Sequence, residues 1–123
     1  MKITSFNPMI ISENADAVIE LFEALGFERR HKKTGINDKD ITSVSMKDAN
    51  GFHVDVAQVE KRPQDLMAIR MNVDDFDEAY EFLTARGFYN AQGEKITDTG
   101  SAHATLMVSP SGFAINLIQH IKD

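Results

Sequence analysis

A turn followed by an alternating strand occurs twice in this chain, and this duplication constrains the fold more than any other feature. Each copy joins short polar residues and a glycine to a strand in which apolar and polar side chains alternate. The copies run from Asp48 to Val56 and from Ser109 to Leu117. Two pairs of glycines share one spacing of 61 positions, Gly26 with Gly87 and Gly51 with Gly112. The spacing indicates two related modules, in which Asp55 and Asn116 occupy the middle of the repeated strand.

The first module is expected to have the order β-α-β-β-β. Strands are predicted at residues 3–11, 27–33, 41–47 and 52–59, with a loop rich in turn formers at 34–40. After the first strand, an apolar stripe recurs at helical spacing, made of Ala15, Val18, Phe22 and Leu25. Ser12 or Asn14 is the expected N-cap of this helix, and Gly26 is its expected left-handed terminator.

The second module repeats this order after a linker at residues 60–65. Strands are predicted at 66–73, 89–97, 103–108 and 113–120. The helix between the first two opens at Asp75, with Glu78 three residues later as in a capping box, and stops at Gly87. The prediction is an α+β fold of one domain, residues 1–123, made of modules at about 1–59 and 66–123.

Composition excludes several classes of function. The formal charge of −6 leaves no basic surface for nucleic acid, and the absence of cysteine excludes disulfides, thiol nucleophiles and cysteine-bound metals. The first residues are broken by polar side chains and a proline, so no signal peptide is expected, and no apolar run is long enough for a membrane span. The sequence therefore predicts a cytoplasmic protein with neither nucleic acid nor membrane as a partner.

The alternation of side chains predicts which of them face away from the helices. Each half has one sheet face packed on its helix, so the two free faces are expected to form a shared, curved cleft. The predicted cleft side chains are Phe6, Pro8, Ile10, His53, Asp55, Ala57, Ala68, Arg70, Asn72, His103, Thr105, Met107, Ala114, Asn116 and Ile118, with Met46 added as an apolar member.

These features resemble the vicinal oxygen chelate superfamily, which includes glyoxalase I, extradiol dioxygenases, fosfomycin-modifying enzymes and bleomycin-resistance proteins. The resemblance rests on the tandem β-α-β-β-β order, the helix end Ala24-Leu25-Gly26-Phe27 and the turn Ser109-Pro110-Ser111-Gly112-Phe113. It covers essentially the whole chain. It implies the glyoxalase/bleomycin-resistance/dioxygenase fold, in which tandem modules form a curved mixed sheet, but it says little about the reaction.

The resemblance also implies positions for a metal ion, which metal-dependent members hold with residues of the first, fourth, fifth and eighth strands. Counted back from Gly26 and Gly87, the first- and fifth-strand positions fall on Phe6 and Ala68, and the fourth- and eighth-strand positions fall on Asp55 and Asn116. Phenylalanine and alanine have no metal-binding atom, and an asparagine is a weak neutral oxygen donor. The sequence therefore predicts that the family metal site is absent and that the protein needs no cofactor.

Two residue groups keep other chemistries open. His53, Asp55 and His103 would suit zinc or ferrous iron if they converged, and each is a candidate acid or base. Arg70 either anchors an anionic ligand or pairs with Asp55.

The preferred interpretation is a protein that binds a small molecule, for sequestration or drug resistance, and forms a homodimer. The predicted ligand-binding residues are Phe6, Ile10, His53, Asp55, Arg70, His103, Met107 and Asn116. The alternative is a lyase, isomerase or dioxygenase-type enzyme with a relocated metal or an acid–base site. A purely structural interaction domain is a third class.

Overall fold

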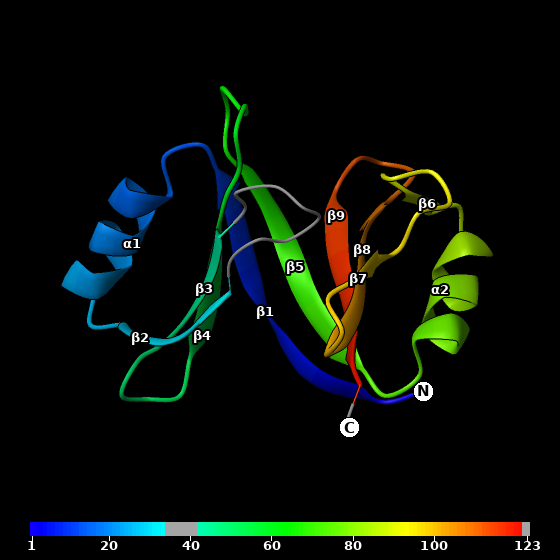
Figure 1. Cartoon of the computed structure of the whole chain (residues 1–123), viewed down its shortest axis with the longest axis horizontal. Coiled ribbons are helices and arrows are strands. Elements are labelled where there is room, and N and C mark those ends of the chain that lie inside the picture. The colour runs from blue at the N-terminus through cyan, green and yellow to red at the C-terminus, as the bar shows by residue number, and fades with distance from the viewer. Residues whose placement is uncertain (34–41, 122–123) are drawn as a thin grey trace. The chain divides into compact units, whose positions relative to one another are not determined.

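The computed structural model describes residues 1–33 and 42–121 (Figure 1). The chain divides into two compact units, each containing one helix. The α1 unit comprises Asn7–Met67, and the α2 unit comprises Met1–Phe6 with Ala68–Asp123. The loop predicted at residues 34–40 lies outside the described residues.

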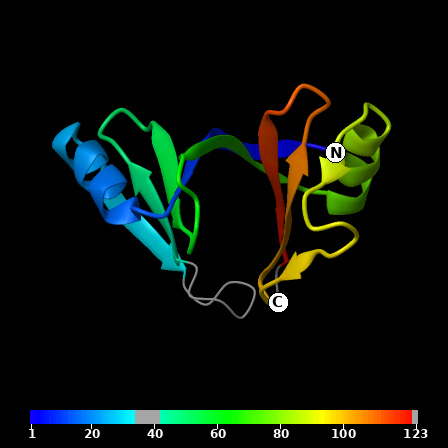
Figure 2. The same ribbon diagram turned by 90° about the horizontal axis from the view of Figure 1, so that it is seen from above.

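The α1 unit contains the first four long strands. They are β1 (Ile3–Ser12), of which residues 7–12 belong to this unit, β2 (Glu28–Lys33), β3 (Thr42–Lys47) and β4 (His53–Gln58), and the helix α1 spans Ala15–Ala24. The order in the sheet is β2-β3-β4-β1. The β2/β3 and β3/β4 pairs are antiparallel, whereas β4 pairs with β1 in parallel. Figure 2 shows α1 on one face of this sheet.

The α2 unit repeats the arrangement with a modified third element. It consists of β5 (Leu66–Val73), α2 (Phe76–Thr84), β6 (Tyr89–Asn90), β7 (Thr97–Asp98), β8 (Ala102–Val108) and β9 (Ala114–His120). The order is β5-β9-β8-β6, and β7 also pairs with β8. The β5/β9 pair is parallel, and β8 is antiparallel to its neighbours. The α+β class, the tandem order and the mixed sheet pairing predicted from the sequence are confirmed.

The single strand predicted at residues 89–97 is wrong. A turn separates β6 from β7, and its backbone is held by the side chain of Asn90. The Asn90 amide donates to the Lys95 carbonyl and its Oδ1 accepts from the Gln92 N–H, which are the local bonds that favour turns over strands.

The first residues of the chain belong with the α2 unit because they bond to its helix start. The Lys2 carbonyl accepts from the Asp74 N–H at 3.0 Å, and the Lys2 N–H donates to Asp74 Oδ1 at 2.6 Å. The Met1 amino group donates to the Glu78 carboxylate, and this bond raises the pKa of the amino group.

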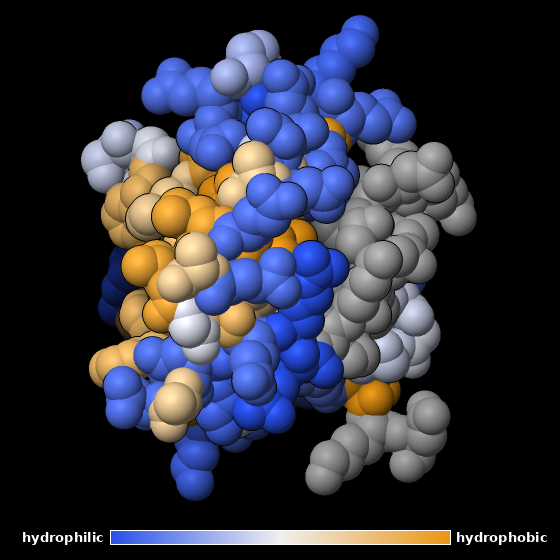
Figure 3. Space-filling view, turned by 90° about the vertical axis from the view of Figure 1, so that its left-hand side faces the viewer, coloured by the Kyte–Doolittle hydropathy of each residue, from blue (hydrophilic) through white to orange (hydrophobic). Residues whose placement is uncertain are grey.

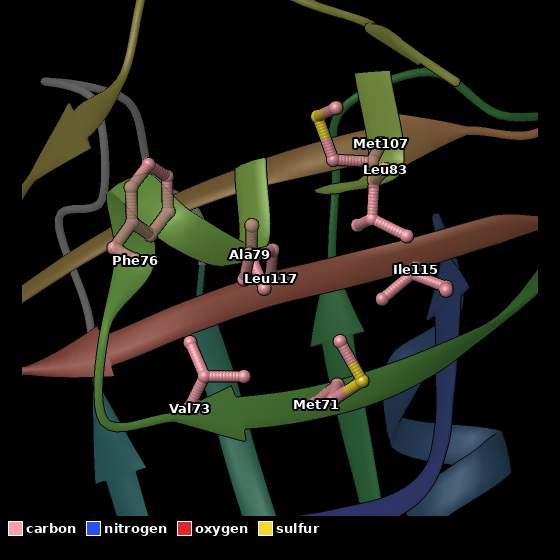
Figure 4. Close-up of a cluster of buried hydrophobic side chains, with 8 residues drawn as sticks. All are labelled: Met71, Val73, Phe76, Ala79, Leu83, Met107, Ile115 and Leu117. Atoms are coloured by element: carbon pink, nitrogen blue, oxygen red, sulfur yellow. The ribbon is translucent and has the colours of Figure 1, made fainter. Parts of the chain in front are cut away.

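Each helix covers a compact apolar core on its own sheet. Under α1, the buried side chains are Ala15, Ile19, Val44, Met46, Val54 and Val56. Under α2, they are Met71, Val73, Phe76, Ala79, Leu83, Met107, Ile115 and Leu117 (Figure 4). Met46 was predicted in the cleft, but it is opposite Val54 in the β3/β4 register and is fully buried beneath α1. Neither helix within the described ranges has the length and apolar character needed to cross a membrane.

A glutamine from the last strand of each unit binds the start of its helix. Gln58 Oε1 accepts from the Ala15 N–H at 2.9 Å, and Gln119 Oε1 accepts from the Phe76 N–H at 2.7 Å. Each Nε2 donates to the carbonyl two residues before that N–H. Gln58 and Gln119 are 61 positions apart, as are their partners, so the duplication extends to tertiary hydrogen bonds. These bonds satisfy N–H groups that a helix start leaves without intrahelical partners.

The helix caps predicted from the sequence agree only in part with those in the structure. Asp75 Oδ1 accepts from the Glu78 N–H, as predicted. Asn14 occupies the N-cap position of α1 without a side-chain bond, while Ser12 Oγ accepts from the Asn14 N–H. At the other helix end, Gly26 has the positive φ expected of a left-handed terminator.

Candidate functional site

The helix-free face of the α2 unit carries three rows of side chains across β5, β9 and β8. Residues paired in register on neighbouring strands point to the same face, so the rows follow from the pairing. They are Ala68–Ala114–Val108, Arg70–Asn116–Leu106 and Asn72–Ile118–Ala104. The predicted faces of Arg70 and Asn116 are thus confirmed, and the two residues are direct neighbours.

The middle row differs from the two beside it in burial and chemistry. Arg70, Asn116 and Leu106 are half-buried, so a cation, an amide and an apolar side chain are partly open. In the outer rows, Ala68, Ala114, Asn72 and Ile118 are all buried. On β5 and β9, a partly accessible polar pair therefore lies between buried neighbours, while the β8 members of the outer rows, Val108 and Ala104, are half-buried. Small-molecule sites often have this composition, with few polar groups among apolar ones.

Asn72 is exceptional among the buried polar residues of this face. Its side chain is 5% exposed. Within residues 1–33 and 42–121, its Oδ1 is the buried side-chain nitrogen or oxygen that lacks a hydrogen-bond partner. Buried polar atoms are nearly always paired, so this oxygen requires an explanation.

The helix-free face of the α1 unit presents a carboxylate at the equivalent position. The row across β3, β4 and β1 is Ser45–Asp55–Met9. Asp55 is buried, and its oxygens accept from Asn7 Nδ2 at 2.9 Å and from Ser45 Oγ at 3.2 Å. These two neutral donors fix the orientation of the carboxylate. The face predicted for Asp55, and for His53 on the same strand, is confirmed.

The face predicted for β1 is wrong. Ile10 is paired with Val56, whose side chain packs beneath α1, so Ile10 lies on the helix side. Asn7 reaches Asp55, which places its neighbour Phe6 on the opposite face, and Phe6 is 61% exposed. Both faces of this strand are largely apolar, so alternation did not identify which face the helix covers.

The face predicted for β8 is also wrong. Met107 is paired with Ile115 and is fully buried under α2. Thr105 is on the same side, where its hydroxyl donates to Asn90 Oδ1 at 2.5 Å. His103 contacts the Phe76 ring edge-on at 6.3 Å, and its Nε2 is 3.5 Å from Asp98 Oδ2. Alternation therefore did not identify the helix side of β8, where local hydrogen bonds allow polar residues to lie under the helix.

Asn7 was missed in the sequence, although a signal was available. Counting back from Gly26 led to Phe6, whereas the 61-residue spacing applied to Ala68 leads to Asn7. The structure supports the second count, because Asn7 and not Phe6 contacts Asp55.

The residues at the family's metal positions fit a metal ion poorly. With Asn7 in place of Phe6, they are two amides, one carboxylate and Ala68, which has no donor atom. The carboxylate of Asp55 is already bonded by Asn7 and Ser45. In the part of the chain that the structure describes, no three His, Cys, Asp or Glu residues are grouped to hold an ion. This donor set offers one strong oxygen ligand for a divalent cation.

Comparison with solved structures identifies the fold. The chain is similar to a Streptomyces coelicolor methylmalonyl-CoA epimerase variant in complex with 2-nitronate-propionyl-CoA (TM-score 0.70, 13% identity, 98% of this chain and 100% of that chain). It is also similar to a glyoxalase I mutant from Zea mays (TM-score 0.69, 14% identity, 98% and 44%). A third similar structure is a glyoxalase/bleomycin resistance protein/dioxygenase superfamily member from Vibrio splendidus 12B01 (TM-score 0.62, 16% identity, 96% and 99%).

No family model and no curated protein matches the chain. At these low identities, the structural similarity establishes the fold and leaves the activity open. The chain has the vicinal oxygen chelate fold, as the resemblance implied.

Proposed function

We propose that this protein binds a small acidic molecule on the helix-free face of the α2 unit, without a metal ion at the family's position. One observation carries the proposal: the half-buried polar pair Arg70–Asn116 lies between neighbours on β5 and β9 that are buried. The guanidinium offers a positive charge and paired N–H donors for a carboxylate or phosphate. A role in sequestration or drug resistance accords with such binding.

The similar epimerase provides further support, because its structure holds 2-nitronate-propionyl-CoA. That compound carries anionic groups, so a protein of this fold accommodates an acidic small molecule. The proposal for the present chain is limited to this class of ligand.

The test is a screen of small carboxylic acids and phosphate esters by thermal shift, followed by titration calorimetry. Arg70→Met should weaken binding of each acid found by at least tenfold, which corresponds to about 1.4 kcal/mol. Arg86→Met is the matched control, since Arg86 lies over the Phe82 ring on α2, with its guanidinium carbon 3.6 Å from the ring centroid. Equal loss in both variants, or no loss in Arg70→Met, would contradict the proposal.

Elemental analysis tests the metal part of the proposal separately. Purified protein is expected to contain far less than one zinc, nickel or iron per chain. About one such metal per chain, lost in Asp55→Ala, would refute this.

The alternative is an enzyme of the lyase or isomerase class that uses Asp55 as a base. It is favoured by the position of this carboxylate, which is buried and oriented by Asn7 and Ser45. A base needs a defined position relative to the proton that it takes. Turnover of a small molecule by the purified protein, abolished in Asp55→Asn while the melting temperature is unchanged, would establish this alternative.

We also propose that the protein forms a homodimer. Leu21 on α1 and Leu25 at its C-cap are 57% and 63% exposed, and Figure 3 shows hydrophobic surface on the side of the molecule that carries α1. Burial of exposed apolar surface is a common reason for subunit pairing. Sedimentation at micromolar concentration should give twice the mass of one chain, and a single-chain mass would count against the dimer.

A further inference from the structure

The buried oxygen of Asn72 is the starting point. Other buried polar side chains of the described residues have partners: Thr105 donates to Asn90, and Ser109 Oγ accepts from the Phe113 N–H. Asn72 Oδ1 has none among them. Leaving a buried acceptor unpaired costs the desolvation of that atom, with no bond to offset it.

The fold itself does not require an asparagine at this position. The duplication places Ile11 at the equivalent point of β1, 61 positions earlier. Ile11 is opposite Ala57, just as Asn72 is opposite Ile118. An apolar residue is therefore compatible with this site in the same architecture. Asn72 occupies a position where a hydrophobic side chain would avoid an unpaired oxygen.

The position of Asn72 relates it to the row proposed to bind the acid. Asn72 is two residues after Arg70 on β5, and side chains two apart on a strand share a face. Their Cα atoms are therefore about 7 Å apart, from the rise of about 3.3 Å per residue. One small molecule can span that distance. Its acidic group would lie at Arg70 and a neighbouring donor at Asn72.

We propose that Asn72 Oδ1 accepts a hydrogen bond from an N–H or O–H group of the ligand. The ligand class is then a small carboxylic acid with an amide N–H or a hydroxyl close to its acidic group. This inference rests on the proposed function and specifies its substrate class. Asn72 is 5% exposed, so a ligand reaches this oxygen only if neighbouring atoms move. A buried water is the competing occupant.

The experiment uses a matched pair of probes, N-acetylglycine and N-acetylsarcosine. Both carry a carboxylate, but only the first has an amide N–H. The wild-type protein should bind N-acetylglycine at least tenfold more tightly, measured by chemical-shift titration. In Asn72→Leu, which has a similar shape without the oxygen, this preference should disappear and the Tm should rise by roughly 3 °C.

Asn90→Leu is the control, because Asn90 is also buried in the α2 unit but both its Oδ1 and its Nδ2 have hydrogen-bond partners. Its Tm should fall, and its preference for N-acetylglycine should persist at a temperature where it is folded. Asn72→Ala gives a second variant in case leucine does not fit.

The outcomes separate this inference from the proposed function. If both probes bind the wild type equally and both weaken in Arg70→Met, the acid site stands and the role of Asn72 is refuted. If Asn72→Leu is stabilised but still prefers N-acetylglycine, the oxygen is served by water only, and the inference fails. If neither probe binds while other acids do, the assigned ligand class is wrong. If no acid binds at all, both proposals fail.

Discussion

The two units use one scaffold to present different chemistry at equivalent positions. In the α1 unit, the central row is Ser45–Asp55–Met9, whereas in the α2 unit it is Leu106–Asn116–Arg70. The first row contains a buried anion that neutral donors of its own unit already bind. The second contains a cation beside an amide, half-buried.

The difference teaches which parts of the duplicated module are constrained by folding. The glutamine at the helix start and the polar residue that closes the turn recur 61 positions apart. Asp48 Oδ1 accepts from the Phe52 N–H, and Ser109 Oγ accepts from the Phe113 N–H. The central rows of the helix-free faces differ in residue type between the units, so the shared backbone does not dictate the residue types there.

The largest expected effect comes from removing the polar centre of each row. Asp55→Ala leaves the buried Asn7 amide without its bond to the carboxylate, and unfolding free energy should fall by about 3 kcal/mol. Asn116→Ala should cost about 1 kcal/mol or less, because Asn116 is half-buried. Urea denaturation of both variants measures the difference. Equal losses would show that the two residues have the same role and would remove the contrast between the rows.

The second comparison concerns the glycines that end the helices. Both have positive φ, +105° for Gly26 and +91° for Gly87, which side chains adopt only at a cost. A Cβ on Gly87 would be 2.8 Å from Pro110 Cγ, whereas nothing lies within 4 Å at Gly26. Gly26→Ala should therefore cost about 1 kcal/mol and Gly87→Ala about 2 kcal/mol or more. In a Pro110→Ala background, the loss of unfolding free energy caused by Gly87→Ala should come closer to the loss caused by Gly26→Ala. An unchanged difference between the two losses would contradict the steric explanation.

Replacing either helix-start glutamine should destabilise the protein by the same amount, in contrast to replacements in the two central rows. Gln58→Ala and Gln119→Ala each remove a side-chain acceptor from a helix N–H, at a cost of about 1 kcal/mol. Thermal unfolding should place the two variants within a few tenths of a kcal/mol of each other. A large difference between the two losses of stability would indicate that the helix-start bonds have diverged between the units, as the helix-free faces have.

The smallest effect is expected on the outer helix surfaces. Leu21 of α1 and Leu25 at its C-cap are equivalent to Phe82 of α2 and Arg86 just after that helix, where the guanidinium covers the ring. Leu25→Arg should change stability by no more than about 0.5 kcal/mol, as is usual for exposed positions. The same variant should weaken the proposed dimer if α1 contributes to it. An unchanged sedimentation mass would indicate that the dimer interface lies on another surface.

Most of the fold could be predicted because its signals are local or repeated. The glycines that end the helices, the turn before each last strand and the Asp75 cap all act over a few residues. The interruption of the strand predicted at residues 89–97 could not be predicted. The side-chain bonds of Asn90 that make residues 91–96 a turn do not alter the alternation of apolar and polar residues.

For the candidate site, the sequence by itself determined the faces of β4, β5 and β9. There, Val54, Ile69 and Ile115 are each followed by a polar residue, and large apolar side chains recur at every second position, so one face is clearly apolar. This was sufficient to place Asp55, Arg70 and Asn116 away from the helices. Only the tertiary structure decided the faces of β1 and β8, where both faces are apolar enough to be buried and register selects between them.

The partners of the polar residues were also decided by tertiary structure alone. Asn7 meets Asp55 across 48 positions of sequence, and the unpaired oxygen of Asn72 appears only once its surroundings are packed. Burial and hydrogen bonding depend on atoms brought together from distant segments. A register shift of one residue moves every side chain of a strand to the other face, where its neighbours are different. The sequence therefore shows which residues are polar, but it does not show which of these polar residues have their hydrogen bonds satisfied.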